Sequence, residues 1–373
     1  MLTQRKYNIL AINWQDIRNP LGGGAEVHFH EIFKRVAALG HSVTLLCCRF
    51  PGALPDEELD GIRIVRRGGR SWFNLVVPMA YAALARRHRY DIVIDDLNKI
   101  PFFTPLYVKE PLLALIHHFF GRSIYLQTNR LAAGYVYYSE KLVPHVYRRT
   151  PFAAVSNSTA LELSAAGHQS WIELLPNAVD GNAYRPDPAG RSQEPLIGYL
   201  GRLKKYKSVD HLLHAFAVVL AKEPRARLLI IGDGDDRDRL QKAGRDLGLA
   251  DRITFTGHVT QEEKNRYLNQ LWLAVNPSPK EGWGLTVIEA NACGVPVVAA
   301  DVPGLRDSVV HERTGLLYPY GDTTAMTAAI HSLLANNERR RLMGEEALAW
   351  AAEFTWERSA QKAVEIIDRA ITQ

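Results

Sequence analysis

The sequence predicts an α/β fold built from two doubly wound parallel sheets. Short apolar runs alternate with longer helical patterns along the chain, which is typical of parallel sheets covered by helices. The length of 373 residues exceeds what one hydrophobic core usually serves. Residues 180–190, rich in Gly, Pro and Asp, separate two series of such elements. We therefore expect two facing Rossmann-like domains, with ligands bound in a cleft beyond the carboxyl ends of the strands.

The expected elements follow this alternation in order. In the N-terminal half, apolar runs predict strands at residues 7–14, 42–48, 62–66, 91–95, 112–117, 152–156 and 172–175, and the helical patterns include residues 25–39, 73–87 and 159–166. The second half has strand candidates at residues 196–203, 227–231, 253–256, 273–276 and 295–300, and helix candidates at residues 209–221, 237–247, 261–269, 287–293, 323–335 and 347–372. The predicted domains are residues 1–185 and 191–350, followed by a C-terminal helix at 351–373.

The composition is that of an ordinary globular protein, with 47% hydrophobic and 23% charged residues. The three cysteines, Cys47, Cys48 and Cys293, form no disulfide framework, because two are adjacent and all lie in apolar runs. No signal peptide precedes Tyr7, and no apolar run reaches the roughly 18 to 20 residues that a membrane-spanning helix needs. These features predict a cytoplasmic protein, peripheral at most to the inner face of a membrane.

The net charge of +5 is concentrated in the first half of the chain. Residues 1–190 hold 21 Lys and Arg against 16 Asp and Glu, and the remaining 24 and 24 cancel. A basic half can meet an anionic membrane surface or a phosphorylated acceptor, although a mild excess of solvated arginines explains the charge equally well. Aromatic residues accompany this charge at Trp72, Phe73, Phe102 and Phe103. The scattered basic residues match no nucleic-acid-binding pattern, so we expect no nucleic-acid partner.

The strongest functional signal is the string KEGWGLTVIEA at residues 280–290. It places Glu281 in a loop after a strand candidate and Glu289 in the helix that follows. Gly282 and Gly284 let the backbone approach a ligand, and the free N–H groups at the start of the helix attract phosphate. A carboxylate near phosphate is repelled unless it faces hydroxyls. Glu281 is therefore predicted to accept hydrogen bonds from a sugar, and Glu289 from a ribose.

This string, followed by CGVPVVA at residues 293–299 and PGLRD at residues 303–307, resembles the family-four group of retaining glycosyltransferases, which have the two-domain GT-B fold. That group carries two glutamates with seven residues between them, as Glu281 and Glu289 have here. The resemblance extends over nearly the whole chain and is strongest from Gly198 to Pro319. It implies a C-terminal helix that crosses back to the first domain. The donor site that it implies includes Gly282, Trp283, Gly284, Leu285 and Thr286.

The second motif is GRLKKYK at residues 201–207, directly after a strand candidate. Arginine offers a planar fork for phosphate oxygens and lysine a compact charge, so the two together can stabilise a diphosphate. The resemblance assigns that contact to Arg202 and Lys207, while Lys204 and Lys205 are expected to be solvated. The family often has glycine after its lysine, where this chain has Ser208.

The third motif is PLGGGAE at residues 20–26, between the first strand and the first helix. Glycines here can bring a helix N-terminus close to an anion, but the sixth position from Gly22 is Val27, which does not fit the dinucleotide fingerprint. In the resembling family, paired glycines let the donor diphosphate and the acceptor approach this loop, which assigns the role to Gly23 and Gly24. A tight strand-to-helix turn explains the glycines about as well.

His117 ends an apolar run, so it is expected to be exposed at the carboxyl end of a strand, where the family has a histidine near the transferred sugar. His118 is the competing candidate, because alternation sends neighbouring strand residues to opposite faces. Four strand-end residues are expected to border the nucleotide base: Asp233, Gly234, His258 and Val259.

No metal cluster is visible, so we expect neither a metal nor a cofactor. Asp95 and Asp96 are adjacent acids at a strand end, as in transferases of another fold that has one such sheet. The resemblance implies transfer of a hexose-type sugar from a nucleotide-diphosphate sugar to a glycan, lipid-linked or small-molecule acceptor, in polysaccharide or glycolipid biosynthesis. It implies retention by same-face attack, in which a donor phosphate oxygen takes the acceptor's proton. The alternatives are a sugar-nucleotide epimerase of similar architecture and a noncatalytic nucleotide-binding protein.

Overall fold

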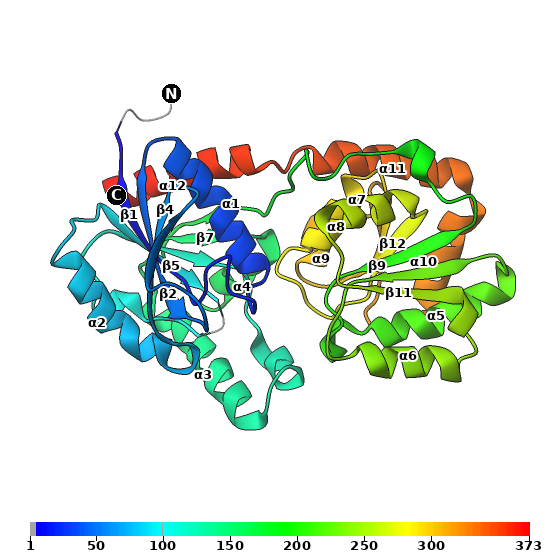
Figure 1. Cartoon of the computed structure of the whole chain (residues 1–373), viewed down its shortest axis with the longest axis horizontal. Coiled ribbons are helices and arrows are strands. Elements are labelled where there is room, and N and C mark those ends of the chain that lie inside the picture. Colours follow the sequence, from blue (N-terminus) through cyan, green and yellow to red (C-terminus); the bar gives the residue numbers. More distant parts are fainter. Residues whose placement is uncertain (1–4, 99) are drawn as a thin grey trace. The chain divides into compact units, whose positions relative to one another are not determined.

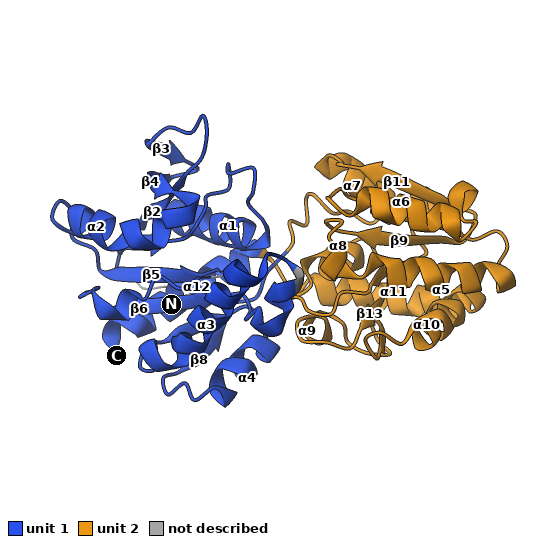
Figure 2. Ribbon diagram, turned by 90° about the horizontal axis from the view of Figure 1, so that it is seen from below, with its two compact units in different colours: residues 1–178, 356–373 blue, residues 179–355 orange. Residues whose placement is uncertain are grey.

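The computed structural model describes residues 5–98 and 100–373 and divides the chain into two compact units. Unit 1 comprises the chain up to Ala178 together with Trp356–Gln373, and unit 2 comprises Val179–Thr355 (Figure 2). The division falls ahead of the segment that the sequence marks as a linker. That segment belongs to unit 2 because its backbone is fastened there: the N–H groups of Arg185 and Asp187 donate to the side chains of Asn265 and Asn269.

Unit 1 is built on an eight-stranded sheet in the order β3-β4-β2-β1-β5-β6-β7-β8 (Figure 1). Its strands are β1 (Asn8–Ile12), β2 (Ser42–Arg49), β3 (Asp56–Leu59), β4 (Ile62–Gly69), β5 (Ile92–Leu97), β6 (Leu112–Ile116), β7 (Phe152–Ala154) and β8 (Ile172–Leu174). All neighbours are parallel except β3 and β4. The sequence pattern missed β3, because an Asp-Glu-Glu-Leu strand at a sheet edge buries no continuous apolar face.

Five α-helices of unit 1 are α1 (Gly24–Ala38), α2 (Phe73–Ala85), α3 (Arg130–Val146), α4 (Asn157–Ala165) and α12 (Trp356–Thr372). The predictions for α1, α2 and α4 are confirmed within a few residues. The single helix predicted at 347–372 is wrong: α11 (Asn337–Ala351) ends in unit 2, and α12 begins in unit 1 after four intervening residues. The connection is held in unit 2, since the ring of Phe354 packs against Trp283 and Trp350.

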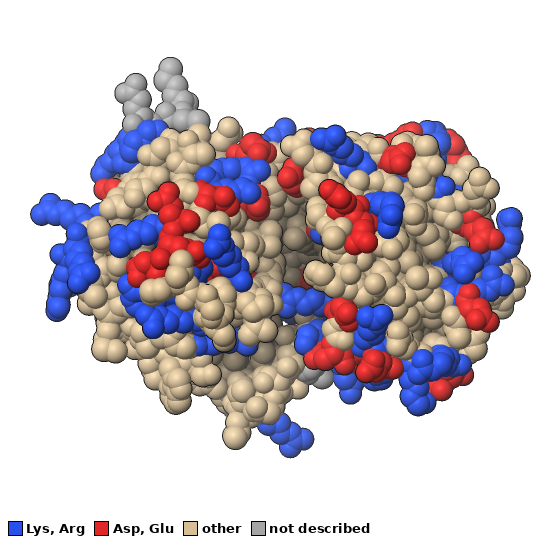
Figure 3. Space-filling model, viewed as in Figure 1, with Lys and Arg blue, Asp and Glu red and all other residues tan. Residues whose placement is uncertain are grey.

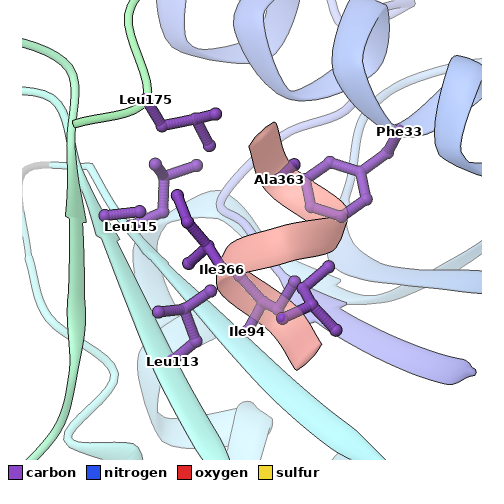
Figure 4. Close-up of a pocket in the computed structure, with 9 residues that line it drawn as sticks. Phe33, Ile94, Leu113, Leu115, Leu175, Ala363 and Ile366 are labelled. Atoms are coloured by element: carbon purple, nitrogen blue, oxygen red, sulfur yellow. The ribbon is translucent and has the colours of Figure 1, made fainter. Parts of the chain in front are cut away.

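The last helix, α12, completes the core of unit 1. Ala363, Ile366 and Ile367 of α12 are buried against side chains from the sheet and from α1. They leave a void of about 10 Å³, whose other lining residues are Phe33, Ile94, Leu113, Leu115, Ala153 and Leu175 (Figure 4). The lining is almost wholly apolar, so the void offers a water molecule no hydrogen-bond partners. The helix is also tied by charge, because Arg369 and Lys362 both pair with Glu173.

Unit 2 has a six-stranded sheet that is parallel throughout, in the order β11-β10-β9-β12-β13-β14. Its strands are β9 (Leu196–Leu200), β10 (Arg227–Ile231), β11 (Ile253–Gly257), β12 (Leu273–Asn276), β13 (Val297–Ala300) and β14 (Gly315–Tyr318). Its other helices are α5 (Val209–Lys222), α6 (Arg237–Asp246), α7 (Gln261–Gln270), α8 (Leu285–Asn291), α9 (Leu305–Ser308) and α10 (Thr323–Ala335). The prediction of two doubly wound sheets is confirmed, although the four-residue strand β14 was missed.

Across the described residues, no helix combines the length and the apolar character that crossing a bilayer requires.

We predict that Ile366→Ala lowers the free energy of unfolding of unit 1 by about 2–5 kcal/mol, because it removes buried methyl groups beside an existing void. Urea denaturation measures the change. Leu161→Ala on α4 is the matched control, since that leucine is 69% exposed and its loss should change stability by only about 0.5 kcal/mol. Equal effects of the two variants would contradict the role assigned to α12.

Candidate active site

The strongest sequence signals of unit 2 lie where its strand order reverses. The chain runs from β9 through β10 to β11 on one side, and then returns to place β12 on the other side of β9. The loops after β9 and β12 therefore leave the carboxyl edge of the sheet next to each other, which is where parallel α/β sheets bind ligands. Arg202 and Lys207 lie in the first loop and Glu281 lies in the second.

Lys207 and Glu281 form an ion pair between these two loops, with Nζ 2.5 Å from Oε1. Their side chains are only 15% and 18% exposed. Burial disfavours the ammonium, but the Glu281 carboxylate and Tyr206 outweigh burial, so the pKa of Lys207 is raised. Lys207 is therefore a held, charged group rather than a solvated surface lysine.

Arg202 lies close to this pair. Its side chain is exposed. Its positive charge lowers the pKa of Lys207, so the two cations are close enough to repel each other. Its carbonyl oxygen accepts a hydrogen bond from the buried Tyr199 hydroxyl, 3.2 Å away. The structure thus brings together Arg202, Lys207 and Glu281, as the sequence predicts.

Ser208 adopts a left-handed backbone conformation, with φ 55° and ψ 34°. A residue with a Cβ costs roughly 1–2 kcal/mol in that conformation, so glycine would adopt this turn without that cost. The Ser208 hydroxyl lies 3.0 Å from the hydroxyl of Tyr320. The turn redirects the chain into α5 immediately after Lys207.

The Asp233–Gly234 loop after β10 packs directly on the Arg202 loop. A Cβ on Gly232 would lie 2.2 Å from the Gly201 carbonyl oxygen, and one on Gly234 would lie 2.1 Å from the Leu203 carbonyl oxygen. The two loops also share a backbone hydrogen bond of 2.9 Å from Leu203 to Asp233. Backbone packing therefore explains these two glycines, because a side chain at either position would prevent the two loops from making contact.

The remaining strand-end candidates lie farther along the same edge. The Asp233 carboxylate pairs with Arg237 at 3.2 Å, and Arg237 also lies beside Gly257 at the end of β11. His258 is exposed and Val259 is half-buried in the loop that follows. Asp233, His258 and Val259 therefore border the site without touching the Lys207–Glu281 pair.

The central residues of the 280–290 string mostly hold the loop in shape. Trp283 is buried and packs edge to face on Phe354, so its indole is part of the core. Gly284 has φ +79°, and a Cβ there would lie 2.6 Å from the Ser308 hydroxyl. Leu285 begins α8, and Thr286 accepts a hydrogen bond from Asn276. Of the string's side chains, Glu281 is the one that contacts Lys207.

Glu289 lies in α8 as predicted and is buried. Its Oε1 accepts hydrogen bonds from the Tyr184 hydroxyl and from Lys264 Nζ, the latter at 2.9 Å. Burial and the nearby carboxylate raise the pKa of Tyr184, so its phenol remains a donor. Lys264 Nζ also lies 5.1 Å from the Tyr184 ring centroid. The sequence did not indicate this pairing, because Tyr184 lies in the breaker-rich segment and Lys264 in another helix.

Unit 1 has its own reversal of strand order, between β1 and β5. Gly23 caps α1, and its N–H donates to the Glu26 carboxylate at 2.6 Å. Glu26 is buried and also accepts from Asn98, which follows β5. Around Gly24, by contrast, the space that a Cβ would enter is open within 4 Å.

His117 is buried rather than exposed, which corrects the prediction from its strand-end position. Its Nε2 lies 2.8 Å from Asp96 Oδ1, and Asn13 donates to Asp96 Oδ2 at 2.7 Å. The ring of His28 meets the ring of His117 edge to face, with centroids 5.2 Å apart, and burial lowers the pKa of His28 to about 3. Asp96 and His28 were missed as partners of His117, although Asp96 was visible as a strand-end acid.

The competing His118 is half-buried, and its ring lies 4.3 Å from that of Phe120. The acids Asp95 and Asp96 are both engaged by side chains of unit 1, Asp95 by Thr104 and Tyr147 at 2.5 and 2.6 Å. Burial raises the pKa of Asp95 to about 6.

Two family models match this chain and together span most of it. A model described as Glycosyltransferase Family 4 matches residues 22–182, and one described as Glycosyl transferases group 1 matches residues 181–350.

Curated relatives match about half of the chain. A D-inositol 3-phosphate glycosyltransferase of Nocardia farcinica is 35% identical over 215 residues, which are 54% of this chain and 48% of that protein. A GDP-mannose-dependent alpha-(1-6)-phosphatidylinositol monomannoside mannosyltransferase of Mycobacterium tuberculosis is 31% identical over 221 residues, 55% of this chain and 57% of that protein. The chain thus spans about half the length of these relatives.

Solved structures match over nearly the full length. Sucrose-phosphate synthase from Thermosynechococcus elongatus aligns with a TM-score of 0.83 at 22% identity, covering 98% of this chain and 99% of that one. Anabaena Alr3699/HepE, solved in complex with UDP-glucose, aligns with a TM-score of 0.77 at 18% identity, covering 97% and 100%. With two parallel sheets and both family models in chain order, this protein belongs to the family-four, group 1 glycosyltransferases of GT-B fold.

Proposed function

We propose that this protein transfers a hexose-type sugar from a nucleotide-diphosphate sugar to an acceptor, with retention at the anomeric carbon and without a metal ion. The observation that carries the proposal is the convergence of Arg202, Lys207 and Glu281 at the point where the unit 2 sheet reverses its strand order. Two cations beside one carboxylate suit a ligand that joins a diphosphate to a hydroxylated sugar.

In the proposed reaction, negative charge develops on the leaving diphosphate as its bond to the sugar breaks. Arg202 and Lys207 stabilise that charge, and the partly buried setting of Lys207 strengthens its effect. Glu281 accepts hydrogen bonds from sugar hydroxyls. The acceptor attacks the face from which the diphosphate leaves, and a phosphate oxygen of the donor takes its proton.

Glu289 is proposed to hold the ribose of the donor. Tyr184 and Lys264 both donate to its Oε1, which fixes the orientation of the carboxylate. We propose that Oε2 then accepts hydrogen bonds from the ribose hydroxyls. In unit 1 we assign a contact with the transferred sugar to His117, with Asp96 and Asn13 setting the orientation of its ring.

The acceptor is proposed to be lipid-linked or a glycan, recognised by unit 1. The basic excess of residues 1–190 supports an anionic acceptor. Two relatives described above support an anionic acceptor, since one is named for an inositol phosphate and the other for a phosphatidylinositol mannoside.

The function is tested first by thermal shift with a panel of nucleotide sugars, because a ligand that binds the folded state raises apparent stability by mass action. The stabilising donor is then supplied with a labelled sugar, with and without candidate acceptors. Release of nucleoside diphosphate that depends on an acceptor supports transfer. Conversion of the donor to an epimer without any acceptor would contradict it, as would the absence of any stabilising nucleotide sugar.

We predict that Arg202→Ala and Lys207→Ala each lower turnover at least tenfold, in line with the loss of one preorganised donor to a developing anion. Steady-state rates with the donor selected above measure this. Lys205→Ala is the matched control, because Lys205 is an exposed lysine of the same loop and should keep its rate. Wild-type turnover in both test variants would contradict the proposal that Arg202 and Lys207 bind the diphosphate.

The two glutamates are predicted to have separable roles. Glu281→Gln should impair transfer while leaving the affinity for the nucleoside diphosphate largely intact, since its proposed contact is with the sugar. Glu289→Ala should weaken that affinity, since its proposed contact is with the ribose. Calorimetry with the diphosphate product distinguishes them, and an equal loss in both variants would refute the division.

Tyr184→Phe should reproduce part of the Glu289 effect, because it removes one hydrogen bond to Oε1 and leaves the ring in place. One such bond contributes about 0.5–1.5 kcal/mol, which corresponds to a roughly 2- to 12-fold weaker affinity for the nucleoside diphosphate. Tyr318→Phe serves as the control, because it removes a hydroxyl of β14 for which the described residues provide no hydrogen-bond partner. Unchanged affinity in Tyr184→Phe would show that Tyr184 does not position Glu289.

A further inference from the structure

An apolar stripe runs along the outer face of α2 in unit 1. Trp72, just before the helix, and Leu75 and Met79 within it are spaced by three and four residues, so they share one face. Their neighbours Phe73 and Val77 point the other way and are buried in the core. The aromatic pair Trp72 and Phe73 is thus split, with only Trp72 available at the surface.

A second stripe runs along α3. Leu131, Tyr135, Tyr138 and Leu142 follow one another at spacings of four, three and four, while Ala133, Val136 and Val143 on the opposite side are buried. Together with Trp72, Leu75 and Met79, these seven side chains are between 48% and 89% exposed. Large apolar side chains gathered in this way are uncommon on the surface of a soluble monomer.

A hydrogen bond joins the two helices that carry these stripes. Asn74 Nδ2 on α2 donates to the Tyr135 hydroxyl on α3 at 2.8 Å. Asn74 precedes Leu75, and Tyr135 lies in the middle of the α3 stripe. We refer to the seven exposed residues as the α2–α3 surface. In the view of Figure 1, α3 forms the lower part of unit 1, and the same part of Figure 3 is mostly without charged residues.

The margins of this surface are basic. Residues 70–89 contain four arginines and no acid, and residues 119–149 contain five Lys and Arg with Glu140 as the sole acid. Glu140 is buried, and its carboxylate accepts from the backbone N–H groups of Phe120 and Gly121 at 2.7 and 2.8 Å. No acidic side chain of the described residues in these segments is therefore exposed, although neutral polar side chains such as Ser71 and Asn129 are.

This combination fits an anionic lipid surface better than a second copy of the chain. Apolar and aromatic side chains enter the headgroup region, and Lys and Arg beside them pair with acidic headgroups. Two copies meeting through this face would bring their basic segments close together, which opposes association.

The geometry points to a bilayer-docking site on unit 1, in which the α2–α3 surface inserts into the headgroup region of a membrane that contains anionic phospholipid. This proposal rests on the proposed function in one respect: docking would bring the protein to a membrane that contains its lipid-linked acceptor. It does not depend on which sugar is transferred.

The test is sedimentation with vesicles of phosphatidylcholine alone and of phosphatidylcholine mixed with phosphatidylglycerol, at low and moderate salt. The full chain should bind the anionic vesicles at least tenfold more strongly, and the difference should shrink as salt screens the charges. Met79→Ser combined with Leu131→Ser should lower binding about tenfold, and Arg86→Glu combined with Arg87→Glu should abolish the preference for anionic vesicles.

The matched control is Leu54→Ser combined with Leu161→Ser, two leucines of unit 1 that are 61% and 69% exposed outside this surface. It should bind vesicles as the wild type does. All six substituted positions are exposed, so thermal unfolding should be nearly unchanged in each of the three double variants.

Three results would overturn the docking site: no binding to anionic vesicles at low salt, an equal loss in the control, or a lipid-free dimer that Met79→Ser with Leu131→Ser converts to a monomer. The last result would make the surface a self-association interface. Nucleotide-sugar binding is measured on the same samples. Its absence beside normal vesicle binding would count against the proposed function alone, and the converse would count against docking alone.

Discussion

The reversal of strand order next to the first strand of each sheet governs where chemistry can occur in this protein. In unit 2 it sets the loops after β9 and β12 side by side, so Lys207 and Glu281 meet although 74 residues separate them. In unit 1 the reversal between β1 and β5 brings Asn13 to Asp96 and Glu26 to Asn98 in the same manner. Both polar networks thus arise from topology, because parallel strands deliver their carboxyl ends to one edge.

Charge pairing then determines which ionised side chains can be buried at the carboxyl edges of the sheets. A lysine as enclosed as Lys207 is held in its charged form only by an anion nearby, and Glu281 supplies that anion. Removing one partner of such a pair leaves the other desolvated and unmatched, which costs more than the pair itself contributes. Glu289 follows the same rule with a phenol and an ammonium as its partners. Each carboxylate of the 280–290 string is therefore placed by a partner from a different loop or helix.

Local pattern was sufficient to predict the two sheets, the loop position of Glu281 and the helical position of Glu289, because alternation and helix-stop signals act over a few residues. It was insufficient wherever the cause lies far along the chain. Tyr184 meets Glu289 from 105 residues away, and no spacing rule links them. His117 seemed exposed from its strand end, yet Asp96 and His28 enclose it. The helical tail reads as continuous, and only the packing of Phe354 on Trp283 shows why it is interrupted.

The assignment of α12 to unit 1 also bears on how the chain is made. Unit 2 is continuous in sequence, whereas unit 1 needs Ala363, Ile366 and Ile367 from the last helix to close its core. During synthesis from the N-terminus, unit 2 can reach its final packing while unit 1 still exposes the apolar groove that α12 will fill. The half that is translated first therefore completes its core only after unit 2 has been synthesised.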